Sequence, residues 1–489
     1  MTLIFPIFFP IVVGAVLFFL PSVKDRKILL GITGVTLIMT TISVFAVLLG
    51  EADSYTLFYL TKTLPVYFKL DGMGRIFVTA VSVVWLCAGF FSFEYMKHEQ
   101  EEKRYFGFYL IVYGILVGLN FSGNIVTFYM FYELMTLLSM PLVLHSKSKE
   151  AIMAGLKYLF YSFCGAYMVL FGIYFLFRFS NTLTFTAGGV LNQELIKGRE
   201  PFLLVVVFLM ILGFGVKAGM FPMHGWLPTA HPVAPAPASA VLSGIIVKGG
   251  VLGIVRTVYF LFGAEFIRGT WVQNVWLCLT LFTIFMGSML AYREKVLKKR
   301  LAYSTVSQVS YILFGLALLQ TRALTGSMLH VLCHAFIKSG LFMCAGAIIY
   351  KTGKTRVDEL TGIGKKMPAL IWCYTICSLG LIGIAPTGGF LSKWYLATGA
   401  LDSALPVFSW FGPVVLLVSA LLTAGYLLPI TVQGFFPGKD FDYNNFEKQE
   451  AGLYMLIPVL IVTVLSVVIG ICSADVVQYI TTGIQGMLG

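Results

Sequence analysis

Charged residues are scarce in this sequence. They make up 11% of its 489 residues, whereas 58% of the residues are hydrophobic, and the mean hydropathy is +0.89. An ordinary soluble domain has about a quarter of its residues charged, so this composition excludes that class. Apolar runs near or above the roughly 20 residues that cross a bilayer recur along the chain and indicate an integral membrane protein.

Closely paired cysteines are also absent. The eight cysteines are scattered through apolar runs, and Cys373 and Cys377 have three residues between them, where a redox or zinc pair has two. The sequence has no H-E-x-x-H pattern either. We therefore expect no cofactor and no metal in this chain, and no redox or hydrolytic centre of its own.

The sequence also lacks the pattern of membrane strands and that of a secretory signal. The apolar runs, residues 202–213 for example, do not alternate with polar residues as membrane strands do, so a barrel is excluded and the expected fold class is all-α. Residues 1–27 carry their basic cluster after the apolar run, which is the reverse of a secretory signal. We expect this run to be the first span.

The sequence predicts about fourteen transmembrane helices in a single unit, residues 1–489. The loops after odd-numbered spans hold 20 Lys and Arg residues, and the alternate loops hold 7. By the positive-inside rule, both termini are predicted on the non-cytoplasmic side of the plasma (inner) membrane. The net charge of +12 then reflects the cytoplasmic loops and not nucleic-acid binding. The approximate spans are 3–21, 28–49, 75–93, 106–122, 124–144, 157–179, 202–222, 235–262, 271–292, 301–320, 324–350, 369–400, 406–431 and 451–473.

Basic residues inside the predicted spans are the exception to this pattern. Within the apolar stretch Gly213–Arg256, prolines and the histidines His224 and His231 separate Lys217 from Lys248. An ammonium near the centre of a bilayer costs roughly 2.5–3.5 kcal/mol on insertion scales, so such residues face a protein interior or a water-filled path. Five basic residues carry this cost: Lys217, Lys248, Arg256, Lys338 and Lys393.

Two predicted spans contain helix breakers at corresponding places. The seventh is interrupted at Gly219–Trp226, because proline lacks an amide donor and clashes with the preceding helical turn. The twelfth, five spans later, is interrupted at Ala385–Trp394. Paired interruptions of this kind indicate an inverted-repeat transporter with its site near the membrane midplane.

The remaining ionisable residues complete a candidate site. His330, His334 and Lys338 follow each other at four-residue spacing and share one helix face, a pattern typical of a proton wire. The alternatives are a histidine bonded to a backbone carbonyl and a zinc ligand pair. Glu133 is the only acidic residue well inside a span and the expected counter-charge for a buried lysine. Charges about 4 Å apart interact by roughly 4 kcal/mol at an effective dielectric of about 20, which is enough to switch a lysine's protonation. The expected relay lysines are Lys217, Lys248, Lys338 and Lys393.

These motifs resemble the antiporter-like subunits shared by respiratory complex I (NADH:quinone oxidoreductase), Mrp-type Na+/H+ antiporters and energy-converting membrane-bound hydrogenases. The resemblance covers nearly the whole chain. It implies fourteen helices, two inverted five-helix repeats at approximately 106–262 and 271–431, broken seventh and twelfth helices, and proton translocation. The residues that carry it are F-Y-E-L around Glu133, Val216–Gly244, Lys248, Lys298–Gln308, His334–Phe342 and Leu391–Trp394.

The resemblance also implies roles for individual residues. A lysine at Lys393, where some members have glutamate, resembles the complex I subunit 5 and subunit 2 types and the Mrp D-type subunit. The chain ends soon after the fourteenth span, so we expect it to lack the long lateral helix of the subunit 5 type. The implied relay is Glu133 paired with Lys217, then Lys248, then His334 with Lys338, then Lys393, with His330 and His224 as additional candidates.

The leading interpretation is a proton-translocating subunit of a larger membrane complex. Its partners would be the lipid bilayer, paralogous antiporter-like subunits and a redox module, and it would move protons, with Na+ as the coupled ion in an Mrp-type complex. The alternative is a self-sufficient Na+/H+ secondary antiporter, which needs several oxygen ligands for Na+, whereas carboxylates are scarce in the spans. An inert scaffold fits poorly, because packing gives no reason for five costly buried basic residues.

Overall fold

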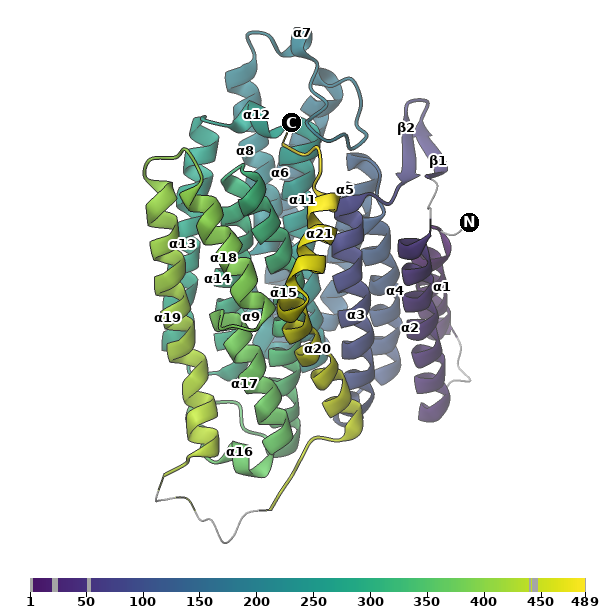
Figure 1. Ribbon diagram of the computed structural model, residues 1–489. Coiled ribbons are helices and arrows are strands. Elements are labelled where there is room, and N and C mark those ends of the chain that lie inside the picture. The colour runs from purple at the N-terminus through teal and green to yellow at the C-terminus, as the bar shows by residue number, and fades with distance from the viewer. Residues whose placement is uncertain (1–2, 20–24, 51–53, 439–440, 442–446, 489) are drawn as a thin grey trace.

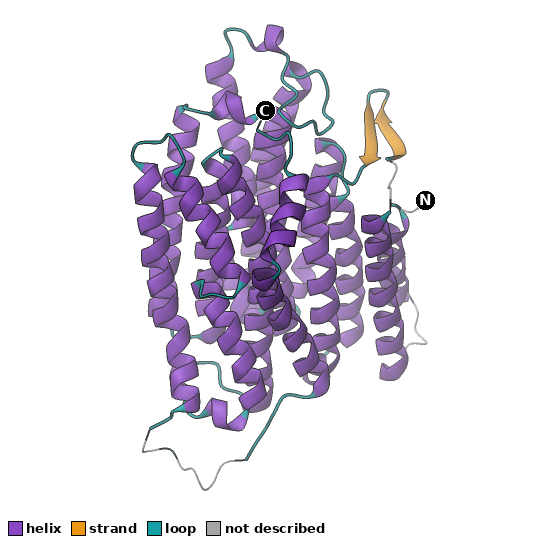
Figure 2. Cartoon of the chain, viewed as in Figure 1, coloured by secondary structure: helices purple, strands orange, loops and turns teal. Residues whose placement is uncertain are grey.

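Long apolar helices run side by side through the molecule and give it an all-α membrane architecture (Figures 1 and 2). The computed structural model describes residues 3–19, 25–50, 54–438, 441 and 447–488. Within these residues, ten helical segments are long and apolar enough to cross a membrane. They are Arg26–Leu49, Gly72–His98, Ile125–Val143, Lys149–Phe179, Glu200–Val233, Ala236–Phe262, Trp271–Arg293, Thr321–Thr352, Phe408–Phe435 and Leu453–Ile471.

The elements follow one another along the chain with few long connections. The first half contains α1 (Phe5–Phe19), α2 (Arg26–Leu49), β1 (Tyr55–Thr61), β2 (Leu64–Phe68), α3 (Gly72–Tyr95), η1 (Met96–His98), α4 (Glu102–Asn120), α5 (Ile125–Val143), α6 (Lys149–Phe179), α7 (Gln193–Ile196), α8 (Glu200–Ala218), η2 (Met223–Trp226), α9 (Leu227–Val233), α10 (Ala236–Val241), η3 (Leu242–Ile246), α11 (Val247–Val255), η4 (Arg256–Phe262) and α12 (Ala264–Ile267). The second half contains α13 (Trp271–Arg293), α14 (Leu297–Ala317), α15 (Thr321–Thr352), η5 (Val357–Glu359), α16 (Ile363–Lys366), α17 (Pro368–Ile382), α18 (Gly388–Leu401), α19 (Phe408–Phe435), α20 (Leu453–Ile471) and α21 (Ser473–Gly483).

Each of the fourteen predicted segments overlaps a helix or an interrupted pair of helices. Four of these helices are not among the ten long apolar segments. Helices α4 and α14 begin with clusters of charged residues, and α1 and α17 have only 15 residues each. The helical membrane fold is therefore confirmed, and the count of fourteen crossings stays a prediction.

The two predicted helix interruptions are both present. Helix α8 ends at Ala218, and Gly219 takes a left-handed conformation (φ 78°) before the short pieces η2 and α9. Helix α17 ends at Ile382, Gly383 is again left-handed (φ 95°), and α18 follows. Glycine suits both positions, because a side chain disfavours positive φ. The peptide bond before the proline is cis in both interruptions, Phe221–Pro222 and Ala385–Pro386.

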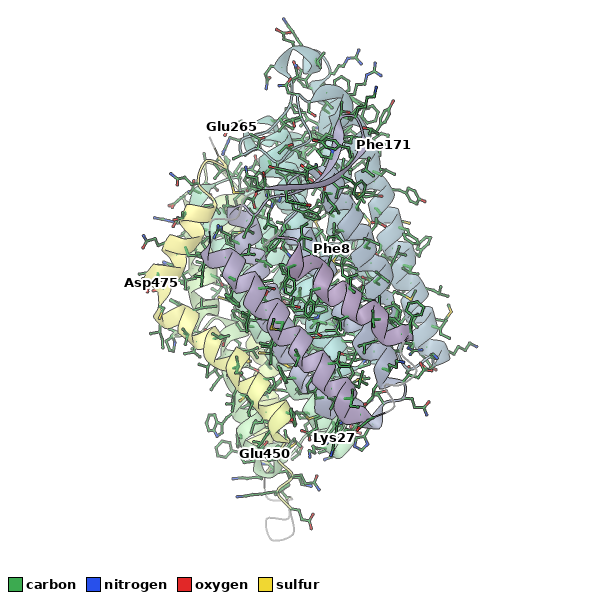
Figure 3. All side chains as sticks on the ribbon, turned by 90° about the vertical axis from the view of Figure 1, so that its right-hand side faces the viewer. Phe8, Lys27, Phe171, Glu265, Glu450 and Asp475 are labelled. Carbon is green, nitrogen blue, oxygen red and sulfur yellow. The ribbon has the colours of Figure 1, made fainter. Side chains whose placement is uncertain are left out.

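The two ends of the bundle differ. Both termini and the β1–β2 hairpin lie at one end, and α16 lies at the other (Figure 1). Charged side chains mark the ends, with Lys27 and Glu450 near the α16 end and Glu265 at the opposite end (Figure 3). Residues 20–24 and 439, which belong to the end of the first predicted span and to predicted loops, lie outside the described residues.

Two features differ from the sequence prediction. The connection predicted as a loop after the second span contains the antiparallel hairpin of β1 and β2. Its turn at Lys62 and Thr63 lacks the glycine or asparagine that signals a tight hairpin, so the sequence gives no warning. Lys298, predicted as a loop residue, is buried instead and donates hydrogen bonds to the carbonyl oxygens of Pro232 (3.0 Å) and Ala234 (2.5 Å).

Two segments lie deepest in the bundle. Ala236–Phe262 is buried throughout its apolar window, and Thr321–Thr352 is buried over nearly all of its window. Helices α6, α19 and α20 are buried over only 39% of their windows, as expected for the outer, lipid-facing layer. Lys248, Arg256, His330, His334 and Lys338 lie on these two segments, whereas Glu133, His224 and Lys393 lie on other elements and are half-buried.

Candidate functional site

Helix α15 carries three ionisable side chains in the core. His330, His334 and Lys338 are each at most 2% exposed. One helical turn contains 3.6 residues, so the four-residue spacing brings all three side chains to the same side of α15. Their partners come from α11, α14 and α18, as described next. The predicted shared face is therefore present.

The centre of this face is the contact between Lys248 and His334. Nζ of Lys248 lies 2.6 Å from Nδ1 of His334 and also donates to the carbonyl oxygen of Ser243 at 2.8 Å. Ser243 belongs to η3, a π-helical turn next to α11. Wider turns of this kind interrupt the regular helical bonding pattern and are frequent at functional sites. The side-chain hydroxyl of Ser243 lies 2.7 Å from that of Thr305 in α14.

Lys338 reaches towards α14. Its ammonium donates to the carbonyl oxygen of Leu301 at 2.8 Å and to the hydroxyl of Ser304. The same ammonium lies 5.9 Å from the ring centroid of Phe342. A buried ammonium needs such partners, because it carries three donors and is shielded from bulk water.

His330 and Lys393 form the far end of the row. Nδ1 of His330 lies 2.8 Å from the hydroxyl of Ser392 in α18, and its ring stacks on Tyr311 at a centroid distance of 5.6 Å. The ammonium of Lys393 lies 4.8 Å from the centroid of the same Tyr311 ring. Lys393 donates to the carbonyl oxygens of Leu381 (2.6 Å) and the neighbouring Ile382 (2.9 Å). These are terminal carbonyls of α17, and the negative end of a helix dipole favours a cation there.

Lys217 is held by hydroxyl groups at the near end of the row. Its ammonium donates to Thr136 Oγ1 (2.8 Å), the Tyr158 hydroxyl (2.9 Å) and Ser162 Oγ (2.9 Å), which come from α5 and α6. The Tyr158 ring also lies 4.3 Å from the ammonium, and Trp226 lies 6.0 Å from it. Contacts of a cation with aromatic faces add to the stabilisation of the buried charge.

Glu133 and Lys217 are not in direct contact in the described arrangement, so their pairing stays a prediction. Among the described residues, no salt bridge involves Glu133, and its Oε1 atom is buried without a hydrogen-bond partner. Lys217 has no free donor for the carboxylate, because its ammonium has three N–H groups and three hydroxyls already accept from them. Glu133 lies one helical turn from Thr136 on α5. To reach Lys217, its carboxylate would have to displace a hydroxyl.

Close helix packing brings α11 against α8 beside Lys217. Gly250, two residues after Lys248, faces α8 so closely that a Cβ there would lie 3.0 Å from Cβ of Lys217 and 2.5 Å from the carbonyl oxygen of Phe214. Any larger residue would push α11 away from α8. The glycine therefore sets how near the backbones of these two segments can approach.

Arg256 and His224 do not join the row. The guanidinium of Arg256 pairs with both carboxylate oxygens of Asp71, the N-cap residue of α3, and lies between the rings of Phe185 and Phe260. Arg256 can be recognised in the sequence as a costly buried charge. Its partner Asp71 cannot be predicted, because that residue lies in a loop. His224 lies in the α8 interruption, where it stacks on Phe221 at 6.1 Å.

Neutral groups hold the lysines of this row. In the described part of the chain, no carboxylate oxygen lies within 4.0 Å of the ammonium of Lys217, Lys248, Lys338 or Lys393. A lysine with hydroxyl, carbonyl or imidazole partners can lose its proton without leaving a buried carboxylate charge unpaired. This arrangement suits proton exchange better than a fixed ion pair. The described residues contain no group of three or more His, Cys, Asp or Glu that could hold a metal ion.

The hydroxyl-bearing partners were not predicted from the sequence. They lie inside apolar helices, where a hydroxyl can donate to a carbonyl of its own helix. Burying it then costs little free energy, so the residue does not stand out in the sequence. The only available signal was the number of Ser, Thr and Tyr residues facing the same way as a buried lysine. These residues are Thr136, Tyr158, Ser162, Ser304, Tyr311 and Ser392.

Comparison with known proteins identifies related membrane proteins. A family model described as NADH:quinone oxidoreductase/Mrp antiporter, TM, matches residues 122–423, and one described as NADH-Ubiquinone oxidoreductase (complex I), chain 5 N-terminus, matches residues 60–106. NADH-quinone oxidoreductase subunit N of Desulforudis audaxviator is 30% identical over 427 residues, which cover 84% of this chain and 83% of that protein. The D-type subunit of the Na(+)/H(+) antiporter of Alkalihalophilus pseudofirmus is 25% identical over 97% of this chain and 95% of its own.

Two solved structures share the fold. A chain of the Mrp complex from Dietzia sp. DQ12-45-1b superposes with a TM-score of 0.86 at 21% identity, over 99% of this chain and 97% of that one. A chain of the membrane-bound sulfane sulfur reductase, an archaeal respiratory membrane complex, gives a TM-score of 0.82 at 26% identity, over 98% of this chain and 77% of that one.

Proposed function

The chain belongs to the antiporter-like membrane subunit family shared by NADH:quinone oxidoreductase and Mrp antiporters, and we propose that it moves protons through the row of buried lysines and histidines. The observation that carries this proposal is the contact of Lys248 with His334 in the most deeply buried part of the bundle. A donor and a proton acceptor at 2.6 Å, both away from lipid and bulk water, are the parts of a proton-transfer step.

The row orders the transfer steps. Lys217 would pass a proton towards Lys248, which lies on α11, the segment that packs against α8 at Gly250. From Lys248 the proton would reach His334, and then Lys338 or His330 on the same face of α15. Lys393, in α18 just after the second helix interruption, would be the exit-side carrier. Interrupted helices support this assignment, because carbonyls freed at a break can bind ions and admit water.

Glu133 would act as the switch at Lys217. In the described arrangement, hydroxyls hold Lys217 and the carboxylate stands apart. If Glu133 moved to about 4 Å from the ammonium, the attraction at an effective dielectric of about 20 would be roughly 4 kcal/mol and would keep the proton on Lys217. Withdrawal of the carboxylate would release that proton towards Lys248.

The membrane topology forms part of the same proposal. We infer that the single unit 1–489 crosses the membrane fourteen times as two inverted repeats, approximately 106–262 and 271–431. The paired interruptions after Ala218 and Ile382 support the repeat. The placement of both termini at one end of the bundle, together with the uneven distribution of basic residues between alternate loops, supports the plasma (inner) membrane with both termini on the non-cytoplasmic side.

The partners would be other membrane subunits. The solved relatives are chains of multisubunit complexes, an Mrp complex and a sulfane sulfur reductase, and one curated relative is a subunit of NADH-quinone oxidoreductase. We propose paralogous antiporter-like subunits and a redox module as the partners here. Co-purification from native membranes separates the cases: iron–sulfur and quinone-reactive partners indicate a redox pump, and small membrane subunits alone indicate Mrp-type exchange with Na+.

Proton translocation by the native complex tests the function. Inverted vesicles that carry the wild-type chain should acidify when energised, as followed with a pH-sensitive dye. Lys248→Met should abolish acidification with the complex still assembled, because methionine fills the space but carries no proton. Lys197→Met, which removes an exposed loop lysine, is the matched control and should behave as wild type. Full acidification by Lys248→Met would contradict the relay, and Na+/H+ exchange by the purified chain alone would favour a self-sufficient antiporter.

A further inference from the structure

A glutamine in the core has no partner for its amide. Gln308 of α14 is fully buried, and neither Oε1 nor Nε2 has a hydrogen bond within the described residues. The same holds for Nε2 of His330 and for Nε2 of His334 in that part of the chain. Buried amides and ring nitrogens are nearly always satisfied by protein groups or by ordered water. Four polar atoms of three residues therefore need an explanation.

The helix geometry places these three residues on the facing sides of α14 and α15. On α14, Ser304 bonds to Lys338, and Tyr311 stacks on His330. On α15, His334 stands halfway between Lys338 and His330, one turn from each. Gln308 stands in the same way between Ser304 and Tyr311 on α14. Tyr311, towards the end of α14, contacts His330, towards the start of α15, so the two helices run antiparallel. Gln308 and His334 are each the middle one of the three residues on their helix, and Gln308 therefore lies opposite His334.

The protonation of His334 strengthens the case. When the Lys248 ammonium donates to Nδ1 of His334, the neutral ring must carry its own hydrogen on Nε2. That Nε2–H group then needs an acceptor on the side of the ring away from Lys248. A carboxamide opposite the ring offers an acceptor in Oε1 and a donor in Nε2.

The ionisable groups of α15 are not bonded to one another in the described part of the chain. The rings of His330 and His334 are 5.8 Å apart between centroids, at an interplanar angle of 35°. No hydrogen bond joins these two rings, or joins His334 to Lys338, among the described contacts. A proton cannot cross such gaps without an intervening donor and acceptor. Water supplies both, and it can bridge polar groups that are too far apart to bond directly.

We propose that Gln308, together with Nε2 of His330 and Nε2 of His334, forms a water-binding site that links the two histidines. Gln308 is then a positioning residue: its amide orients the water, and the ring nitrogens exchange protons with it. The role of this water in transport rests on the proposed function of the row. The binding of water itself does not, so the two can be tested apart.

Water-to-protein magnetisation transfer in solid-state NMR tests the binding directly. The full-length chain, labelled with 15N-histidine and embedded in deuterated lipid, should show transfer from water to the Nε2 resonance of His334. A His334→Gln variant assigns that resonance among the six histidines. In Gln308→Leu, which removes both polar atoms at similar volume, the transfer should fall at least about fivefold. Transfer that is absent in the wild type, or unchanged in Gln308→Leu, would overturn the proposal.

Transport by the assembled complex gives the second readout. Gln308→Leu should lower the initial rate of vesicle acidification at least about tenfold, because a missing bridge interrupts proton transfer. Ser310→Ala is the matched control on α14. The Ser310 hydroxyl is also buried and has no hydrogen-bond partner among the described residues, but Ser310 is two residues from Gln308 and points to the opposite side of the helix. The acidification rate of this variant should stay within about twofold of wild type. Gln308→Met replaces Gln308→Leu if the latter does not assemble, with the same expected loss.

Water transfer and vesicle acidification test the water site and the proton relay separately. Loss of water transfer in Gln308→Leu with wild-type acidification would show a bound water that transport does not use, and would overturn the positioning role. In the opposite case, water transfer depends on Gln308, but the Lys248→Met variant still acidifies vesicles. That result would contradict the proposed relay and would still support the water-binding site.

Discussion

Nζ of Lys248 and Nδ1 of His334 lie 2.6 Å apart, although 86 residues separate them in the chain. Only one hydrogen can lie between these two atoms, so the ammonium donates when His334 is neutral, and His334 would donate if the lysine were neutral. The two residues therefore form one proton-carrying unit. The carbonyl oxygen of Ser243 holds Lys248 in place for this contact.

A double-mutant cycle tests whether the two residues act as one unit. His334→Gln should lower vesicle acidification about as strongly as Lys248→Met, and the double variant should be no worse than either single one. Groups that carry out one step together show such non-additive losses. Losses that multiply in the double variant would show two independent routes. Assembly of each variant is checked by the yield of the purified complex.

Glu133→Ala should abolish proton translocation while assembly remains intact. The carboxylate makes no salt bridge among the described residues, so its removal should cost little stability. The proposed switch, however, needs a negative charge that can approach Lys217. Glu133→Gln keeps the shape and should fail equally. Pumping at the wild-type rate in reconstituted vesicles would remove the switch from the mechanism.

Lys393→Glu should retain more activity than Lys393→Met. The lysine donates to the terminal carbonyls of Leu381 and Ile382. A protonated glutamic acid could donate to one of them and carry a proton, whereas methionine can do neither. Initial rates of acidification at equal amounts of complex measure the difference. Equal losses in the two variants would argue against a proton-carrying role for Lys393.

His145 should make the protein less stable in acid. It lies just beyond the end of α5, where its Nε2 is 2.9 Å from the carbonyl oxygen of Gln100 and its Nδ1 is 3.4 Å from the guanidinium of Arg104. Burial, together with the positive charge of Arg104, lowers the pKa of His145 from 6.5 to about 4. Between these two values, the unfolded chain binds a proton that the folded chain does not. Stability should therefore fall as the pH drops through this window.

The size of the effect follows from the two pKa values. One pKa unit corresponds to about 1.4 kcal/mol, so His145 alone should cost up to roughly 3 kcal/mol once the pH is below about 4. Thermal unfolding midpoints in detergent, measured from about pH 7 to about pH 4.5, should fall more steeply for the wild type than for His145→Gln. Parallel curves would show that the buried histidine does not contribute.

The class and the candidate residues of this protein follow from its sequence. Composition alone requires a membrane protein, because so few charges cannot cover a soluble domain. The cost of burying Lys217, Lys248, Lys338 and Lys393 makes them stand out, and the four-residue spacing on α15 places His330, His334 and Lys338 on one face. Both helix interruptions are visible as proline and glycine in otherwise apolar runs.

The partners of these residues were decided by the tertiary structure. The sequence predicts Lys217 beside Glu133, but hydroxyls from α5 and α6 occupy its three donors. Arg256 stands in the sequence as a costly buried charge without a visible partner, and a loop aspartate, Asp71, balances it. The β1–β2 hairpin and the burial of Lys298 were likewise unforeseen.

The ionisable residues can be recognised from the sequence and their partners cannot, because the two depend on different things. A charge in an apolar helix is costly wherever it points, so the residue can be recognised without its neighbours. A hydroxyl costs nothing there, because it can bond to its own helix, as Thr136 does to the carbonyl of Tyr132. Which hydroxyl meets which lysine depends on how the helices pack. The sequence by itself determined the ionisable row, and only the packing of α5, α6, α11, α14 and α15 decided what holds each of its members.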